Sequence, residues 1–440
     1  MSNIVPKRIA AALINSLKGG VVPRVGLGYI AVGREAEINA LLNDVEIIED
    51  GGATFRFIVG KYGSGKSFLL QTIRNYVMDK GFVVIDADLS PERRLMGTKN
   101  QGLATYKELI QNMSTKTKPD GGALSLILEK WINSIKIEVM NEQNVDAESP
   151  EFINAVEKKI YTVINEVQSM VNGFDFAKII SMYWKACRTN DENLKTCVLK
   201  WFRGEYQTKR EAKSELNVSV IISDENWYEY IKLFSAFLVG AGYKGMLMLI
   251  DELVNIYKIP NSITRQYNYE KILTMYNDTL QGKAKYLGII MGCTPQCMED
   301  TRRGVFSYDA LKSRIESGKF SDENVRDMLS PMIKLEPLTY EELYVLIEKL
   351  ANIHATLYSY KMNLSENEMI DFIKMEFGRI GAGKNITPRE VIRDFIEILN
   401  ILYQNPDKHM NDILGDNSLK LSENNITETK IHEDFAEFEL

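Results

Sequence analysis

Residues 60–67 read Gly-Lys-Tyr-Gly-Ser-Gly-Lys-Ser. The run satisfies the pattern G-x-x-x-x-G-K-[ST], in which glycines let successive backbone N–H groups turn toward phosphate oxygens. The pattern is informative only between a strand and a helix, and the flanking residues predict both: a strand over Phe55–Val59 and a helix over Phe68–Met78. An idle glycine-rich turn is the alternative, and the flanking elements argue against it.

Each kind of residue in this phosphate loop has its own expected task. Lys66 supplies a point charge to the phosphates, and the Ser67 hydroxyl is expected to take one position on Mg²⁺. The predicted ligand is therefore a nucleoside triphosphate with Mg²⁺. The predicted nucleotide-binding residues are Gly60, Lys61, Tyr62, Gly63, Ser64, Gly65, Lys66, Ser67 and Phe68.

Strands and helices alternate around the phosphate loop. The apolar run Phe82–Asp88 follows the first predicted helix and completes a β-α-β unit, whose crossover connection requires a parallel sheet. Met246–Ile250 and Tyr286–Met291 are further buried strands, whereas Leu95–Leu238 has apolar residues at three- and four-residue spacing. The sequence thus predicts an α/β fold: a parallel-sheet P-loop core with a large helical insertion and, after Leu335, a C-terminal helical lid.

Two carboxylates end the strand Leu247–Ile250. Asp251 and Glu252 follow it at the carboxyl edge of the sheet, where ligands bind in open α/β sheets. We expect Asp251 to hold Mg²⁺ through water and Glu252 to orient and deprotonate the water that attacks the γ-phosphate. An apolar run followed by Asp-Glu also arises by chance. Downstream of a phosphate loop, however, the pair predicts ATP hydrolysis rather than binding alone.

Thr294 is the candidate sensor of the γ-phosphate or the attacking water, since it follows the Tyr286–Met291 strand. The alternative is a threonine that only starts the next turn, ahead of Pro295. Nearby Cys293 and Cys297 are interpreted as small packing residues, because a lone C-x-x-x-C without a nearby histidine is poor support for a metal site.

Three arginines are candidates for transition-state stabilisation. Arg314 is the first choice for a finger given to a neighbouring subunit, with Arg302 and Arg303 as the other candidates. The alternative for Arg314 is a surface arginine paired with an acidic neighbour, Asp309 or Glu316. Arg389, at the second position of a capped lid helix, is placed to bring a cation onto bound phosphates.

One near-repeat of the phosphate-loop pattern is rejected. The run Gly378–Asn385 follows a helix rather than a strand, and it ends in asparagine where the motif needs serine or threonine. It does not predict a second nucleotide site.

Composition is that of an ordinary globular protein. The 440 residues are 45% hydrophobic and 26% charged, and the net charge of −7 gives no global basic footprint for nucleic acid. Four cysteines without C-x-x-C pairing favour a reducing cytoplasm. Glycines interrupt the most apolar window, Leu233–Ile250, so no membrane span is predicted. The stretch Lys200–Lys213 is a local basic and aromatic patch for nucleic acid or, alternatively, a solvated helix face with Trp201 and Phe202 in the core.

The predicted domains follow from these patterns. Capping boxes at Thr339 and Thr387 mark helix starts in the lid, and the acidic run Leu421–Leu440 predicts a flexible tail. The chain divides into an N-terminal helix with the first part of the ATPase core (1–94), the helical insertion (95–240), the second part of the core (241–334), the helical lid (335–404) and an acidic tail (405–440).

The motifs in this order resemble an AAA+ ATPase of the ASCE class: Gly33–Glu37, the phosphate loop, Asp251-Glu252, Thr294, Arg314 and Arg389. More closely, four segments resemble the ATP-binding proteins of BREX phage-defence systems, BrxD and its P-loop relatives: Gly19–Pro23, Ile250–Asn255, Tyr276–Gly282 and Asp300–Leu311. The resemblance implies ATP binding and a place in a prokaryotic antiphage defence system beside other proteins.

We therefore expect a cytoplasmic, Mg²⁺-dependent ATPase whose nucleotide cycle is coupled to the assembly or action of a DNA-associated defence complex. The alternative is a nucleotide-gated scaffold or switch with slow turnover that docks protein partners through the insertion and the tail. A third hypothesis is a DNA-binding ATPase that uses the Lys200–Lys213 patch. The expected partners are other defence-system proteins, DNA either indirectly or through that patch, and further copies of the chain in an ATP-dependent oligomer.

Overall fold

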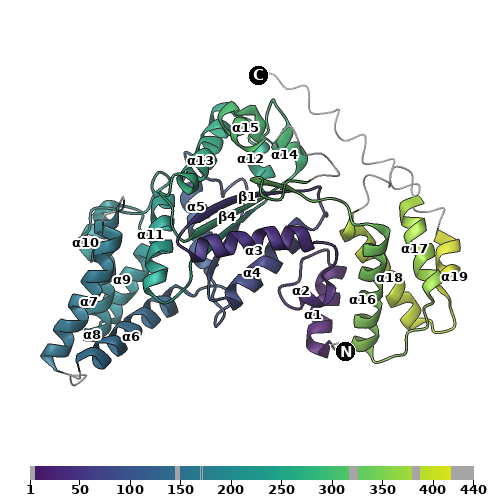
Figure 1. Cartoon of the computed structure of the whole chain (residues 1–440), viewed down its shortest axis with the longest axis horizontal. Helices are drawn as coiled ribbons and strands as arrows, with labels where there is room; N and C mark the ends of the chain where they lie inside the picture. The colour runs from purple at the N-terminus through teal and green to yellow at the C-terminus, as the bar shows by residue number, and fades with distance from the viewer. Residues whose placement is uncertain are drawn as a thin grey trace. The chain divides into compact units, whose positions relative to one another are not determined.

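The computed structural model describes residues 5–143, 149–168, 170, 172–316, 326–378 and 387–417. The chain forms two compact units (Figure 1), and we describe each by itself. The sheet unit comprises Ala36–Val59 and Ile73–Lys334, and the loop–lid unit comprises Met1–Glu35, Gly60–Thr72 and Leu335–Leu440.

The sheet unit is built on five parallel strands, which confirms the predicted α/β class. Their order is β2-β3-β4-β1-β5, and every pairing between neighbours is parallel. Burial on both faces explains why β3 and β4 are almost wholly apolar. The strands are β1 (Ala53–Val59), β2 (Val83–Asp88), β3 (Met246–Asp251), β4 (Leu287–Cys293) and β5 (Met332–Lys334).

A buried ion pair fixes β1 to the helix before it, α3 (Glu35–Glu49). The Arg56 guanidinium donates to both carboxylate oxygens of Asp44, from Nε at 2.6 Å and from Nη2 at 2.7 Å. Its Nη1 donates to the Ser330 carbonyl oxygen at 2.5 Å, in the segment that leads into β5. A planar guanidinium can make all these bonds at once, so one side chain orders three neighbouring segments.

The expected helical insertion is helical, and it shares one continuous apolar core with the sheet. Its centre is aromatic: Phe176 lies edge-on to Phe234 and Phe202, with ring centroids 5.1 Å and 5.4 Å away. Trp131 meets Phe237 in the same manner at 4.9 Å. The helices, coloured blue to teal in Figure 1, are α5 (Gln101–Gln111), α6 (Leu124–Gln143), α7 (Pro150–Gln168), α8 (Gly173–Thr189), α9 (Glu192–Phe202), α10 (Lys209–Leu216) and α11 (Trp227–Gly240).

The remaining helices of the sheet unit lie close to the strand ends or over the sheet. The longest, α13 (Ser262–Leu280), packs on β1 and is joined to α11 by the buried ion pair of Lys232 with Asp278, whose Nζ–Oδ2 distance is 2.7 Å. The others are α12 (Val254–Tyr257), α14 (Pro295–Glu299), the 3₁₀ turn Val305–Ser307 and α15 (Asp309–Ile315).

The loop–lid unit is a helical bundle with its own apolar core. Helix α1 (Lys7–Lys18) packs on α16 (Tyr340–Tyr358) and α18 (Pro388–Gln404), and the apolar face of α1 is buried there. Both predicted capping boxes are confirmed, at Thr339 with Glu342 and at Thr387 with Glu390. Also in this unit are α2 (Leu27–Ile30), α17 (Glu366–Gly378) and α19 (Met410–Asn417).

Helix α19 corrects the expectation that the acidic tail starts at residue 405. Met410 is wholly buried against the lid, and its backbone N–H donates to Glu368 Oε1 at 3.2 Å. The two contacts join α19 to the lid bundle. The acidic run Leu421–Leu440 lies outside the described residues, as does most of the rejected repeat Gly378–Asn385.

Candidate functional site

The carboxyl edge of the sheet gathers the chemistry-bearing residues of the sheet unit. The ends of β2 and β3 lie side by side, because Asp88 pairs in register with Asp251. On the other side of β3, β4 ends at Cys293, which is in register with Val59 at the end of β1. Gly60, the first residue of the phosphate loop, follows Val59 directly. The strand order therefore places the carboxyl ends of β2, β3, β4 and β1 at one edge of the sheet. The sequence predicted this for β1, β3 and β4.

The turn after β3 is held in an unusual backbone conformation. Glu252 has φ of 58°, in the left-handed region that side chains other than glycine enter at a cost of about 1–2 kcal/mol. Its backbone N–H donates to Asp251 Oδ1 at 2.8 Å, and its carbonyl oxygen accepts from the Asn255 backbone N–H at 2.9 Å. Glu252 is thus fixed by its neighbours directly after the strand end.

Asp88 is a residue of this edge that the sequence analysis did not assign. Loss of hydration, and then the charges of Asp251, Asp86 and Glu252, raise the pKa of Asp88 from 3.8 to about 6. The Arg93 guanidinium opposes this shift. The available signal was the Asp-Ala-Asp at residues 86–88, which ends a strand in the same way as Asp251-Glu252 does.

In the loop–lid unit the phosphate loop has the conformation its glycines permit. The loop runs from Gly60 to the start of α4 (Lys66–Asp79), so that helix begins two residues earlier than predicted. Gly63 and Gly65 have φ of 77° and 96°, which turn successive N–H groups to one side. The Lys66 ammonium donates to the carbonyl oxygens of Gly60 at 2.8 Å and Lys61 at 2.9 Å. Ser64 Oγ is buried and, among the described residues, has no hydrogen-bond partner.

Arg34 supports the phosphate loop through hydrogen bonds to backbone carbonyl oxygens, a role that the sequence did not predict. Its Nη2 donates to the Ser64 carbonyl oxygen at 3.2 Å and to the Glu336 carbonyl oxygen at 2.9 Å, and the side chain is buried. One guanidinium therefore joins the phosphate loop to the first residues of the lid segment. The available signal was the Gly33-Arg-Glu motif, which is part of the family resemblance but does not by itself indicate what the arginine contacts.

Arg389 lies against the phosphate loop within the same unit. Its guanidinium carbon is 4.6 Å from the ring centroid of Tyr62, a cation–π contact, and Tyr62 as a residue is 68% exposed. The start of α18 is equally close: a Cβ built on Gly63 would come within 2.8 Å of Thr387 Oγ1 and 3.3 Å of Arg389 Cβ. The lid cation predicted from sequence is thus next to the loop residues predicted to bind the nucleotide.

Thr294 follows β4 and begins α14. Its Oγ1 accepts from the Cys297 backbone N–H at 3.2 Å, so the hydroxyl caps a helix, as the alternative interpretation had it. A capping hydroxyl retains its own hydrogen as a donor, so the sensor assignment stays a prediction. Cys293 and Cys297 are both buried and neither is in a disulfide, as expected of packing residues.

Arg314 is exposed in the last turn of α15. Its Nη1 donates to the Ala310 carbonyl oxygen at 2.7 Å in the same helix, while Glu316 pairs with Lys312 at 3.9 Å. Arg303 lies over the Tyr257 ring at 5.4 Å, and exposed Arg302 donates its backbone N–H to Asp300. The finger assignment of Arg314 stays a prediction, and so does the second choice of Arg302 or Arg303.

The Lys200–Lys213 patch is structural in its aromatic half. Trp201 and Phe202 are buried, at 1% and 0% exposure, so neither ring is available for base stacking. Lys200 pairs with Glu211 at 2.6 Å and with Glu215 at 3.5 Å. The interpretation of a helix face with Trp201 and Phe202 in the core is therefore confirmed, although exposed lysines and an arginine at 209–213 remain on α10.

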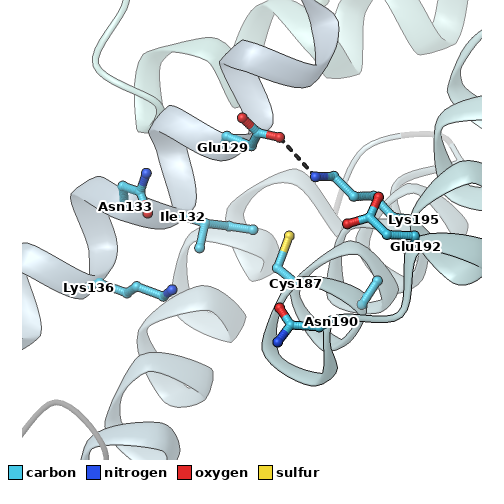
Figure 2. Close-up of a pocket in the computed structure, with 9 residues that line it drawn as sticks. Glu129, Ile132, Asn133, Lys136, Cys187, Asn190, Glu192 and Lys195 are labelled. Atoms are coloured by element: carbon cyan, nitrogen blue, oxygen red, sulfur yellow. Dashed lines mark ion pairs between the residues drawn. The ribbon is translucent and has the colours of Figure 1, made fainter.

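A cavity of about 200 Å³ lies in the insertion between α6, the end of α8 and the start of α9 (Figure 2). Glu129 and Lys195, which both line it, form an ion pair of 3.0 Å. Burial raises the pKa of the Cys187 thiol, which keeps this group protonated and poorly nucleophilic. Among the residues that the structure describes, no group of three or more His, Cys, Asp or Glu side chains is arranged to hold a metal ion, here or elsewhere.

Fold and loop together define the class: a P-loop nucleotide-binding protein with an all-parallel sheet and large helical parts. The chain belongs to the BREX system ATP-binding protein BrxC/D family, whose sequence model matches residues 5–418. The family resemblance found in the sequence is thus confirmed, and with it ATP as the ligand. No curated protein matches the chain. No helix in the described part of the chain is long and apolar enough to cross a membrane.

Proposed function

We propose that this BREX protein hydrolyses ATP to ADP and phosphate at the carboxyl edge of its sheet, in a Mg²⁺-dependent reaction. The observation that carries the proposal is the strand order. Asp251 ends β3 and Thr294 follows β4, the strand between β3 and β1, and the phosphate loop continues directly from β1. An apolar strand that delivers Asp-Glu to this edge is the usual companion of a phosphate loop in enzymes that hydrolyse nucleotides.

In this proposal the phosphate loop holds the triphosphate through its backbone N–H groups. The orphaned Ser64 Oγ fits a ligand with many acceptor oxygens, and the Lys66 ammonium would exchange its loop carbonyls for phosphate oxygens. Arg389 would move its charge from the Tyr62 ring to the same phosphates. These three groups lie within one compact unit, so the loop and the lid cation can act on one ligand.

The donor set suits Mg²⁺. Ser67 and Asp251 offer hard oxygen ligands, and Mg²⁺ in nucleotide sites takes one or two protein ligands with phosphate and water oxygens for the rest. Bound there, the ion supplies charge neutralisation at the phosphates. The absence of a three-residue metal group among the described residues is compatible with such a site.

Glu252 is proposed as the general base. Its backbone is fixed directly after Asp251, and in this proposal its carboxylate accepts a proton from the attacking water. Thr294 is proposed to donate its hydroxyl hydrogen to the γ-phosphate or to that water. Arg314 is proposed to stabilise transition-state charge in a neighbouring copy, an arrangement that needs an ATP-dependent oligomer.

Turnover of the purified chain tests the assignment. Glu252→Gln should bind ATP with near-wild-type affinity and lose hydrolysis by about 100-fold or more, because an amide cannot accept the proton. Glu49→Gln is a matched control, since Glu49 pairs with Lys244 at the surface away from the sheet edge. Wild-type hydrolysis by Glu252→Gln would remove Glu252 from this role.

The broader part of the proposal is that hydrolysis drives the assembly or action of a DNA-associated defence complex in the cytoplasm. Single-turnover rates with and without other BREX proteins or DNA test it. Stimulation by several-fold supports coupling, whereas unchanged slow turnover favours the nucleotide-gated scaffold.

A further inference from the structure

The turn that carries Glu252 is fastened to both neighbouring strands. On one side, the Leu89 backbone N–H, just past the end of β2, donates to the Asp251 carbonyl oxygen at 3.1 Å. On the other side, the Leu253 backbone N–H donates to the Gly292 carbonyl oxygen in β4 at 3.2 Å. These bonds extend the parallel ladder beyond the end of β3 and fix where the turn begins.

One side chain closes this network. Asn255 Nδ2 donates to the Leu89 carbonyl oxygen at 2.8 Å and to the Glu252 carbonyl oxygen at 3.3 Å. Both acceptors are carbonyl oxygens, so the amide orientation is determined: the flipped side chain would place Oδ1 against two other oxygens. The Asn255 backbone N–H also donates to the Glu252 carbonyl oxygen, at 2.9 Å.

The strained residue needs this support. Glu252 has φ of 58°, and a left-handed conformation in a side chain of this size persists only where the surroundings determine it. The backbone N–H of Glu252 is fixed because it donates to Asp251 Oδ1. The carbonyl oxygen of Glu252 is fixed because it accepts from both the side-chain Nδ2 and the backbone N–H of Asn255. Together they fix the direction of the Cα–Cβ bond and thereby the region that the Glu252 carboxylate can reach.

We propose that Asn255 is a positioning residue for ATP hydrolysis, which holds Glu252 in its left-handed conformation and ties it to the exit of β2. The inference rests on the proposed function, because Glu252 is the general base there. Asn255 acts through the backbone of Glu252 and through Leu89, and no role in contacting the nucleotide is assigned to it. Its loss changes the rate of the chemical step more than the binding of ATP.

The test compares Asn255→Ala with a matched control, Asn261→Ala. Asn261 lies six residues further on and caps α13, with its Oδ1 accepting from the Thr264 backbone N–H at 2.9 Å. Loss of a cap costs about 1 kcal/mol of stability, so the control reports what loss of a structural asparagine does by itself. The measurements are kcat, the Kd for Mg²⁺–ADP by calorimetry, and the midpoint of thermal unfolding.

For Asn255→Ala we expect kcat to fall by at least about tenfold, since a displaced base loses much of its effect, while the Kd changes less than about twofold. Asn261→Ala should lower the unfolding midpoint to a similar extent and leave kcat near the wild-type value. Asn255→Ser, whose hydroxyl can replace one of the two donors, should be intermediate, and it serves if the alanine variant does not fold.

Two results would overturn the inference. One is a kcat for Asn255→Ala, or for Asn255→Ser in its place, within twofold of wild type. The other is a fall in kcat that Asn261→Ala reproduces, or that a matching rise in Kd explains. Absence of hydrolysis in the wild-type protein would be a different failure: it removes the proposed function itself, and the positioning role with it.

Discussion

The phosphate loop and the turn after β3 both use left-handed backbone, and they reach it in opposite ways. In the loop, Gly63 and Gly65 adopt φ of 77° and 96° without a side-chain penalty. After β3, Glu252 adopts φ of 58° and is held there by hydrogen bonds from Asn255 and to Asp251. A loop that works through its N–H groups can use glycine. A turn that must present a carboxylate cannot, so its conformation depends on its neighbours.

Gly63→Ala gives the largest expected effect on the loop side of this comparison. The new Cβ would meet Thr387 Oγ1 at 2.8 Å in addition to the strain of a positive φ. We expect ATP affinity to fall by about 100-fold, equivalent to roughly 2.7 kcal/mol, measured by calorimetry. Gly242→Ala is the control, because Gly242 has the same φ of 77° with no atom within 4 Å of the added Cβ. Equal effects of the two changes on ATP affinity would contradict the steric part of this argument.

Arg34→Ala tests whether the loop, like the turn, needs an outside support. The change removes both guanidinium bonds, to the carbonyl oxygens of Ser64 and Glu336. ATP affinity should fall by about tenfold, or roughly 1.4 kcal/mol. Arg34→Lys keeps the charge but cannot bridge two carbonyls with a planar fork, so its affinity should lie between those of the wild type and the alanine variant. Unchanged ATP affinity in Arg34→Ala would show that the glycines suffice.

Glu252→Gly measures the strain in the turn directly. Glycine relieves the left-handed penalty, whereas Glu252→Ala removes the same carboxylate and keeps that penalty. Glycine also makes the unfolded chain more flexible, and this entropic cost must be subtracted from the gain. After that correction, the free energy of unfolding in urea should be about 1 kcal/mol higher for the glycine variant than for the alanine variant. Both should lack hydrolysis. An alanine variant as stable as the glycine variant would show that the turn carries no strain.

The smallest expected effect is a pH dependence of stability in the loop–lid unit, which carries the phosphate loop, caused by His354. Burial lowers the pKa of His354, in the loop–lid unit, below 6.5, and a contact with Asn400 partly opposes the shift. The unfolded chain therefore binds this proton more readily, so the stability contribution is complete above pH 6.5 and declines as the pH falls through the folded pKa. Hydrogen exchange in α16 and α18 between pH 7 and 5 should show the decline, and His354→Gln should remove it. A decline that persists in His354→Gln would assign it to another group.

The elements predicted correctly are those with local signals. The phosphate loop, β3 with Asp251-Glu252 and the two capping boxes each occupy fewer than ten consecutive residues, and their patterns specify the conformation. The three-residue strand β5 has no period to recognise, and it forms because the buried chain beyond Pro331 pairs with β1.

The residues that sequence reasoning missed act over long separations. Asn255 meets Leu89 across 166 positions, and Arg34 meets Glu336 across 302. No local pattern encodes such contacts, because they exist only once the strands are ordered in the sheet or the lid is packed. The aromatic residues at 201 and 202 fitted two interpretations of the sequence, a nucleic-acid surface and a buried core, and the structure buries both in the insertion core.

The strand order also constrains how this chain folds during synthesis. About 160 residues separate the end of β2 from the start of β3, its neighbour in the sheet, and the neighbours of β1 are β4 and β5, which are made later still. At about 5 to 20 residues per second, roughly 8 to 30 seconds pass between the synthesis of β2 and that of β3. During this time the helices of the insertion can form from local contacts. We therefore expect the insertion, which carries none of the proposed catalytic residues, to become structured before the sheet that holds them is complete.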